Sequence, residues 1–230
     1  DTGGAVAVQG TDSSVRVIDA YTINNDAVQG GAFWATDNVG LTVEASSGRG
    51  RCEAPFSDAG LLRRPPCSVI DGNDASFGGG AFAVIQQASA AVYRTIIRNN
   101  TSGGGLGPIA RVANAEAYDG PPARLRVEGS VIHDNSGGFG FYAVENSEII
   151  LSHSTVADNP VTEFRAAASP GRFAAVRLLS SIVDGGSLAF GSTSGDGLTV
   201  VEFDCVIGSA PPDGTGATST FNYSQIDPDF

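Results

Sequence analysis

A six-residue pattern that recurs along the chain constrains the fold more than any other feature. It consists of Ser or Thr, any residue, an aliphatic residue, two further residues and then Asn. The clear copies are Ser68 to Asn73, Thr95 to Asn100, Ser130 to Asn135 and Ser154 to Asn159, and looser copies begin at Tyr21, Ser181 and Cys205. The aliphatic residues, which we call anchors, are Ile23, Ile70, Ile97, Ile132, Val156, Val183 and Ile207. Successive anchors lie 47, 27, 35, 24, 27 and 24 residues apart, so a period of about 24 residues with insertions accounts for every interval.

Glycine clusters and short β-type runs accompany the anchors. Clusters such as Gly30-Gly31 and Gly103-Gly104-Gly105 start 5 to 8 residues after an anchor, where glycine allows the positive φ of a sharp corner. Strand-like runs follow the clusters, as in 80–85 and 138–144, and others precede the anchors, as in 125–127. No segment shows a sustained helical period. Short strands separated by Gly and Asn corners predict an all-β chain wound as a parallel β-helix, a single solenoid domain over the whole sequence.

In a stacked solenoid, equal positions of successive turns form columns with a spacing of about 4.8 Å. The anchors would then form a buried aliphatic column. The hydroxyl residues two positions earlier would form a second column, in which Cys205 stands where the others have Ser or Thr. We therefore expect Cys205 to be a small core residue rather than a reactive thiol. Asn73, Asn100, Asn135 and Asn159 would form a ladder whose side chains hydrogen-bond neighbouring turns.

Two intervals exceed the period and predict loop insertions near residues 46–66 and 107–122. The first is basic on an otherwise acidic chain, and its arginines are Arg49, Arg51, Arg63 and Arg64. Cys52 and Cys67 suit a disulfide that closes this loop and favours an oxidising compartment, although two nearby cysteines can also be free thiols. Long loops on a rigid solenoid often bind ligands, so the four arginines are candidate ligand-binding residues. The alternative is a disulfide-pinned loop that covers the sheet.

Composition excludes several classes of function. The chain has 13 arginines and no lysine, which excludes a lysine base, a Schiff base and a P-loop lysine. Its net charge of −12 argues against nucleic acid or an anionic membrane as a partner. No run approaches the roughly 20 apolar residues of a transmembrane segment. Because Met is absent and the first glycine pair has no anchor before it, we expect a processed or excised chain with a further turn upstream.

The Gly-Gly-aliphatic segments, such as Gly30-Gly31-Ala32-Phe33, and the Ser/Thr-x-Ile-x-x-Asn segments resemble the secreted right-handed β-helix proteins of bacteria in the pectate-lyase-like superfamily. The chain is most similar to surface proteins with polymorphic-outer-membrane-protein-like repeats, and Ile226 to Phe230 looks like the Asp-Pro-x-Phe that often ends the β-helix there. The resemblance implies a right-handed helix and an exported, extracellular or cell-surface protein. The superfamily holds lyases, hydrolases, epimerases, tailspikes and adhesins, so no single activity is implied. Its lysine-dependent and polygalacturonase motifs are absent here, and no catalytic residue is carried over.

Polar residues beside the anchors predict one catalytic arrangement. If the turns stack in register, four of them would gather on the outer surface: Arg98, His133, Asp134 and Asp158. Arg98 beside a uronate carboxylate would acidify the α-proton, and His133 could abstract it in a β-elimination. Asp134 and Asp158 could hold Ca²⁺, the only cofactor that the sequence suggests; none is required. The alternative is a set of ordinary polar residues at a corner beside the Asn ladder.

Two further side chains stand out. If Phe33 points inward, Trp34 points outward by strand alternation and could stack on a sugar ring, or it could lie beneath an insertion. Trp34 is therefore a candidate ligand-binding residue. His153, the other histidine, is expected to be a solvated surface residue.

Three functions are compatible with these observations. The first is a structural or adhesive domain that contacts glycans or cell-surface proteins through its loops. The second is a carbohydrate-active enzyme, a lyase of acidic polysaccharides that uses Arg98 and His133. The third is a tailspike segment, in which such rods trimerise. The absence of lysine and the weak catalytic signal favour the first.

Overall fold

The computed structural model describes residues 2–46, 68–103, 109–114, 120–137, 140–184, 187–194, 198–207, 213–215 and 218–225. In these ranges the chain forms strands joined by turns and bends, and it contains no helix. The predicted all-β class is confirmed for this part of the chain. Cys52, Cys67 and the four arginines of the first insertion lie outside the described residues.

The strands form three sheets whose neighbouring strands run parallel. The eight-stranded sheet has the order β1 (Val6–Gln9), β5 (Phe33–Thr36), β9 (Phe82–Ile85), β13 (Ala110–Ala113), β16 (Phe141–Val144), β19 (Val161–Ala168), β21 (Ser187–Ser194) and β23 (Asp213–Thr215). The thirteen-stranded sheet has the order β2 (Ser14–Ile18), β6 (Gly40–Glu44), β10 (Ser89–Tyr93), β14 (Ala123–Glu128), β17 (Ser147–Ser152), β20 (Phe173–Val183), β18 (Thr155–Ala157), β15 (Val131–His133), β11 (Thr95–Arg98), β7 (Ser68–Asp71) and β3 (Tyr21–Ile23). In this sheet β22 (Leu198–Ile207) also pairs with β20, and β24 (Thr218–Gln225) pairs with β22. The three-stranded sheet contains β12 (Thr101–Ser102), β8 (Asp74–Gly78) and β4 (Asp26–Gln29).

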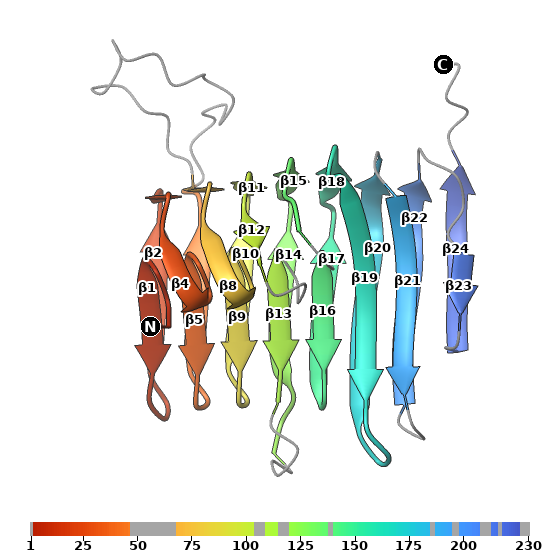
Figure 1. The fold of residues 1–230 in the computed structure, drawn as a ribbon, viewed down its shortest axis with the longest axis horizontal. Helices are drawn as coiled ribbons and strands as arrows, with labels where there is room; N and C mark the ends of the chain where they lie inside the picture. The colour runs from red at the N-terminus through yellow and green to blue at the C-terminus, as the bar shows by residue number, and fades with distance from the viewer. Residues whose placement is uncertain are drawn as a thin grey trace.

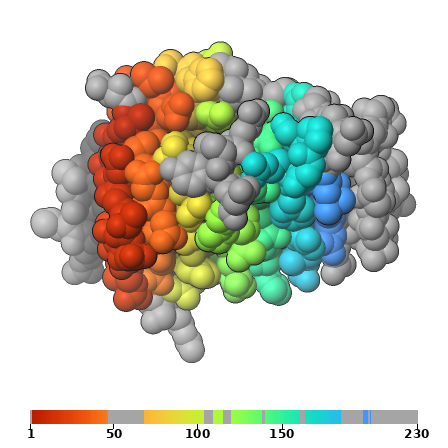
Figure 2. All heavy atoms as spheres, turned by 90° about the horizontal axis from the view of Figure 1, so that it is seen from below, coloured from red at the N-terminus to blue at the C-terminus, as the bar shows by residue number. Residues whose placement is uncertain are grey.

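Strands that are neighbours in space belong to successive passes of the chain, which we call rungs. For example, β9, β10, β11 and β12 follow one another along the chain, and each lies beside the matching strand of the rung before: β5, β6, β7 and β8. Figure 1 shows the rungs side by side in sequence order along the longest axis, and Figure 2 shows the same order as bands on the surface. This arrangement of parallel strands in stacked sheets is compatible with the predicted β-helix.

The predicted anchors pair in register along the thirteen-stranded sheet. Ile97 lies between Ile70 and Ile132, and all three side chains are fully buried. Val156 and Val183 continue the column on the following rungs. The alignment of these side chains inside the molecule is therefore confirmed.

The first predicted anchor, Ile23, is wrong by one residue. Thr22 pairs with Ile70 and is buried, whereas Ile23 pairs with Asp71 on the outward side. Each ladder Asn lies three residues after an anchor. Asn25 lies three residues after Thr22, and its side-chain amide donates to Asn73, the next Asn of the ladder. The ladder position, rather than the most hydrophobic residue, therefore identifies the anchor of this rung.

The predicted Asn ladder is present and buried. The Oδ1 of Asn100 accepts hydrogen bonds from the backbone N–H and the side-chain amide of Asn73, at 3.0 and 2.9 Å. Its Nδ2 donates to Oδ1 of Asn135 and to the carbonyl of Ile70, at 2.9 and 3.1 Å. The rungs before and after repeat this pattern. The side chains of Asn73, Asn100 and Asn135 therefore each join three rungs at a sharp corner of the chain.

The predicted hydroxyl column is confirmed as well. The Oγ of Ser130 donates to the carbonyl of Glu128 at 3.1 Å and accepts a hydrogen bond from the backbone N–H of Thr95 at 3.1 Å. All five members of the column are buried: Ser68, Thr95, Ser130, Ser154 and Ser181. Cys205 pairs with Ser181, which is the column position that the sequence predicted.

Aromatic rings form a second core column on the inner face of the eight-stranded sheet. The rings of Phe33 and Phe82 stack at 5.3 Å, and those of Phe141 and Phe164 stack at 5.4 Å. Ala110 lies in register between Phe82 and Phe141 and separates the two stacks. These rings and the anchors belong to one continuous cluster of buried residues. Both large sheets therefore pack on the same core.

The first insertion lies between β6 and β7. These strands pair in register with β10 and β11 of the next rung, which a single residue, Arg94, joins. Ala45 takes the place of Arg94, and the Oγ of Ser68 donates to the last carbonyl of β6 at 2.6 Å. The two strands are thus positioned as if one residue joined them. The insertion comprises residues 46–67, against the predicted 46–66.

The second predicted insertion, 107–122, is wrong in its extent because β13 lies inside that range. Most of the extra residues lie between β13 and β14, and the rest lie before β13. Ala110 and Arg124 lie twice as far apart in the sequence as their partners on the previous rung, Phe82 and Ser89. The strand was missed because the Pro- and Tyr-rich residues that follow it dominate the composition of the interval.

Deletion of residues 46–67, combined with Ala45→Gly, is expected to leave a chain that still unfolds cooperatively, because β6 and β7 keep their register although the hydrogen bond from the Ser46 N–H to Asp19 is lost. The deletion would join β6 to β7 through one residue, and glycine suits that corner because Arg94 has a φ of 51° there. Thermal unfolding followed by circular dichroism checks this, with Ala45→Gly alone as the control. Loss of the cooperative transition in the deletion variant alone would contradict the proposed splice.

Candidate functional site

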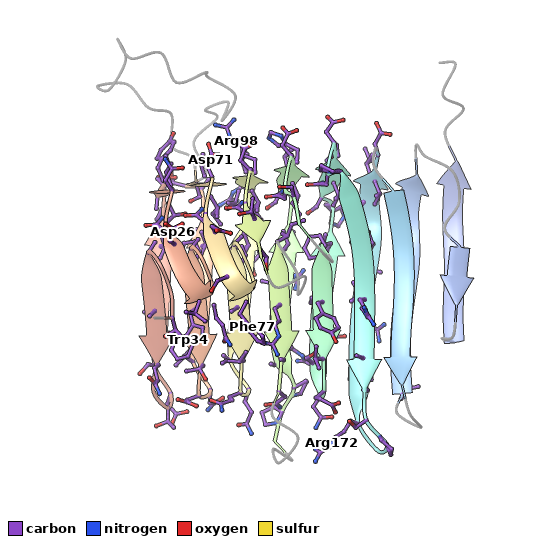
Figure 3. All side chains as sticks on the ribbon, in the orientation of Figure 1. Asp26, Trp34, Asp71, Phe77, Arg98 and Arg172 are labelled. Carbon is purple, nitrogen blue, oxygen red and sulfur yellow. The ribbon has the colours of Figure 1, made fainter. Side chains whose placement is uncertain are left out.

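The residues predicted for a lyase lie on the outward face of the thirteen-stranded sheet. Arg98 and His133 pair in register on β11 and β15. The Nε and Nη2 of Arg98 both lie 2.9 Å from Oδ2 of Asp71, on the rung before, and Figure 3 shows these two side chains together at one edge of the molecule. The Nδ1 of His133 lies 2.7 Å from Oδ2 of Asp134. The structure brings Arg98 and His133 side by side, but each contacts a different carboxylate.

The predicted calcium ligands, Asp134 and Asp158, occupy the same corner on successive rungs, and both have positive φ. The side chain of Asp134 is 55% exposed and contacts His133. Within the described ranges, no three side chains of His, Cys, Asp or Glu gather closely enough to hold a metal ion. Calcium binding at these two residues stays a prediction.

The other predicted polar sites are not joined to this one. His153 is exposed, as expected, at the corner between β17 and β18. Arg94, at the same corner two rungs earlier, donates from Nη2 to the carbonyl of Ala45 at 2.6 Å. The insertion arginines, predicted to bind ligand, lie outside the described residues, and that prediction remains open.

Trp34 points outward from the eight-stranded sheet, as predicted. Its neighbours Phe33 and Ala35 are buried in the core, whereas the indole is half-buried on the outer side. Trp34 pairs in register with Ala7 and Ala83, whose small side chains leave space for the ring over the sheet. Its Nε1 is buried and has no hydrogen-bond partner among the described residues.

Further aromatic and cationic side chains continue the row that contains Trp34. The outward residues in register on β5, β9, β13, β16 and β19 are Trp34, Ala83, Arg111, Tyr142 and Arg165. The guanidinium of Arg165 lies 5.7 Å from the ring centre of Tyr142. That of Arg111 lies 5.3 Å from the ring centre of Phe77, which belongs to β8 and is 44% exposed. We call Trp34, Phe77, Arg111, Tyr142 and Arg165 the aromatic–arginine face; Figure 3 shows Trp34 and Phe77 well away from the edge that carries Arg98.

Arg111 differs electrostatically from the arginines of the other large sheet. Burial lowers the pKa of its guanidinium, an effect that nearby Tyr142 opposes, and the group stays charged because arginine ordinarily titrates far above neutral pH. Among the described residues no carboxylate forms an ion pair with Arg111, and its Nε has no hydrogen-bond partner. By contrast, Arg124 and Arg177 contact the two oxygens of Glu148, at 3.2 and 3.1 Å. Arg111 is therefore a half-buried cation with no neighbouring anion in the described ranges.

The sequence predicted Trp34 but not the other residues of the aromatic–arginine face. The signal that could have found them is strand alternation, since each lies between two core residues, as in Ala110-Arg111-Val112. Alignment of these runs by their core positions places Arg111, Tyr142 and Arg165 in one row. Phe77 had no such signal, because it reaches this face from a different sheet.

Comparisons with protein-family models, with curated proteins and with solved structures found no match. No helix in the described part of the chain is long and apolar enough to cross a membrane. A function must therefore be inferred from the geometry of the chain itself.

Proposed function

We propose that this chain is a non-catalytic, extracellular or cell-surface domain that binds glycans through the aromatic–arginine face. The row of outward aromatic rings on rigid parallel strands carries this proposal. Trp34, Tyr142 and Phe77 are each at least partly exposed on one side of the molecule. An exposed aromatic surface is characteristic of an interaction site, and the apolar C–H face of a sugar ring stacks on such rings. Guanidinium groups beside the rings would donate to sugar hydroxyls.

The scaffold that we propose is a right-handed parallel β-helix with turns of about 24 residues, similar to the pectate-lyase-like superfamily. Two register pairs support this turn length, because Ile132 pairs with Val156 and Phe141 pairs with Phe164, and each partner follows close to one such period later in the sequence. Successive rungs would hold side chains about 4.8 Å apart on a stiff support. An exported location follows from the resemblance and belongs to the same proposal.

Affinity electrophoresis in gels that contain single polysaccharides tests the proposed glycan binding. Trp34→Ala and Tyr142→Ala are each expected to weaken binding by about tenfold, because each removes one stacking surface worth roughly 1.4 kcal/mol. Tyr93→Ala is the matched control, since Tyr93 lies on the outward side of the thirteen-stranded sheet. Equal retention of all three variants in every gel would overturn the proposal.

A polysaccharide lyase is a second candidate, favoured by the register of Arg98 beside His133. Substrate would have to displace the carboxylate of Asp71, which already contacts the Arg98 guanidinium. We therefore expect no absorbance from unsaturated product when the protein is incubated with polygalacturonate or alginate, with or without Ca²⁺. Turnover that disappears in Arg98→Gln would replace the adhesive function with this one.

A further inference from the structure

We propose that the saccharide bound by the aromatic–arginine face carries an anionic substituent, a carboxylate or a sulfate, and that Arg111 holds this group. The inference rests on the proposed glycan binding and narrows it to one class of ligand. It places the anion on the eight-stranded sheet, away from Arg98 and His133. The supporting observations are that Arg111 has no counter-ion among the described residues, that its guanidinium contacts the ring of Phe77, and the order of the row.

The first observation is the missing counter-ion. The chain has 25 acidic residues and 13 arginines, so carboxylates are abundant. Six described arginines contact one: Arg16, Arg94, Arg98, Arg124, Arg126 and Arg177. Arg111 contacts none within the described ranges, although it is half-buried. A partly desolvated cation is costly unless an anion compensates it, so an arriving oxyanion would gain more here than at a paired arginine.

The second observation is the contact between the guanidinium of Arg111 and the ring of Phe77. The guanidinium carbon lies 5.3 Å from the ring centre of Phe77, within the range of a cation–π contact. The contact leaves the N–H groups at the edge of the planar guanidinium as its hydrogen-bond donors. The Nε of Arg111 is buried and has no partner in the described part of the chain, so an arriving anion would be met by the Nη groups at the outer edge. Carboxylates and sulfates accept paired hydrogen bonds from that edge, which a lysine ammonium could not supply in the same fixed geometry.

The third observation is the order of groups along the row. Arg111 lies two strands from Trp34 on one side and two strands from Arg165 on the other, about 10 Å in each direction. Tyr142 lies between the two arginines. Rings and cations therefore alternate along the stacking direction. A linear polysaccharide with repeated anionic groups could lie across the rungs. Its sugar rings would then contact the aromatic side chains, and its anionic groups would contact the arginines.

Matched charged and neutral polysaccharides test this inference. Polygalacturonate is compared with its fully methyl-esterified form, and dextran sulfate with dextran, so that each pair differs in charge on one backbone. We expect the wild-type protein to bind at least one charged member about tenfold more tightly than its neutral counterpart, with the difference reduced by added salt. Which charged polymer binds distinguishes a carboxylate from a sulfate.

Substitutions of Arg111 locate the effect. Arg111→Gln is expected to remove the tenfold preference for the charged polymer and to leave binding of the neutral one unchanged. Arg111→Lys, which keeps the charge but loses the paired donors, should retain only part of the preference. Arg124→Gln is the matched control, because it removes one arginine from the thirteen-stranded sheet, where Glu148 keeps Arg177 as a partner. Circular dichroism confirms that each variant is folded.

The outcomes separate this inference from the function on which it rests. If Trp34→Ala abolishes binding but Arg111→Gln leaves the charged preference intact, the glycan-binding face stands and the role of Arg111 is overturned. If the wild-type protein binds the neutral polymers as tightly as the charged ones, the anionic ligand is overturned while glycan binding survives. If no polymer binds, both proposals fail.

Discussion

An Asn100→Ala variant is expected to unfold with a free energy about 4 kcal/mol below that of the wild-type chain. The Asn100 side chain is fully buried and accepts two hydrogen bonds from Asn73. It donates one to the carbonyl of Ile70 and one to Oδ1 of Asn135. Alanine would leave the backbone N–H of Asn73 without this partner, at a cost of roughly 1–3 kcal/mol. It would also remove one hydrogen bond each from the Asn73 side-chain amide, the Ile70 carbonyl and Oδ1 of Asn135.

Urea unfolding followed by circular dichroism measures this loss, and Asn99→Gly is its matched control. Asn99 precedes Asn100 at the same corner with a φ of 54°, a conformation that glycine adopts freely. Its side-chain amide contacts Asp71 at the surface and takes no part in the ladder, so the control should cost less than about 1 kcal/mol. Asn100→Asp would bury a carboxylate whose second oxygen faces the Ile70 carbonyl and Oδ1 of Asn135, so it should destabilise the chain at least as much as Asn100→Ala. A loss below about 1 kcal/mol for Asn100→Ala would show that the ladder does not stabilise the stack.

The thirteen-stranded sheet could be predicted from the sequence because one short segment carries three structural requirements at fixed spacing. In the segment from Ser130 to Asn135, the hydroxyl of Ser130 bridges two backbones, Ile132 fills the core and Asn135 extends the ladder. All three requirements recur on the four rungs whose segments begin at Ser68, Thr95, Ser130 and Ser154, because these rungs stack directly. The same segment therefore appears repeatedly, and the number of residues between its copies gives the length of one rung.

The anchor of the first rung was predicted wrongly because the repeated pattern is weak there and the more hydrophobic residue was chosen. Ile23 is more apolar than Thr22, yet Thr22 occupies the core column. The hydroxyl of Thr22 donates to the carbonyl of Val69 at 3.3 Å, which allows a polar residue to be buried there. The position of Asn25 in the ladder fixes the register and overrides the small transfer free energy that separates Thr from Ile.

The aromatic–arginine face was not predicted because its members have no common motif and no constant spacing. A longer stretch of chain separates Arg111 from Tyr142 than separates Tyr142 from Arg165, although each pair is adjacent in space. Insertions of different length between rungs break the period on this sheet. The missing counter-ion of Arg111 is also invisible in the composition, because it depends on which column each carboxylate occupies.

Phe141→Ala is expected to lower the free energy of unfolding by about 4 kcal/mol, because it opens a cavity in the aromatic column of the core. The ring is fully buried and stacks on Phe164 at 5.4 Å with nearly parallel planes. Its other neighbour in register is Ala110, which is too small to fill the space. Phe141→Leu should cost about 1.5 kcal/mol or less, since most of the volume is retained. Urea unfolding measures both variants.

Tyr142→Ala is the matched comparison, because the next residue of the same strand points to the opposite side of the sheet. Its outward ring contributes little to the core, so this variant should lose about 1 kcal/mol or less while it loses polysaccharide binding. Phe141→Leu should behave in the opposite way, with lower stability and unchanged binding once it is folded. If Phe141→Ala were tolerated while Tyr142→Ala unfolded the protein, the inward and outward faces of β16 would be reversed. The glycan-binding row and the role of Arg111 would then fail with them, since both depend on that alternation.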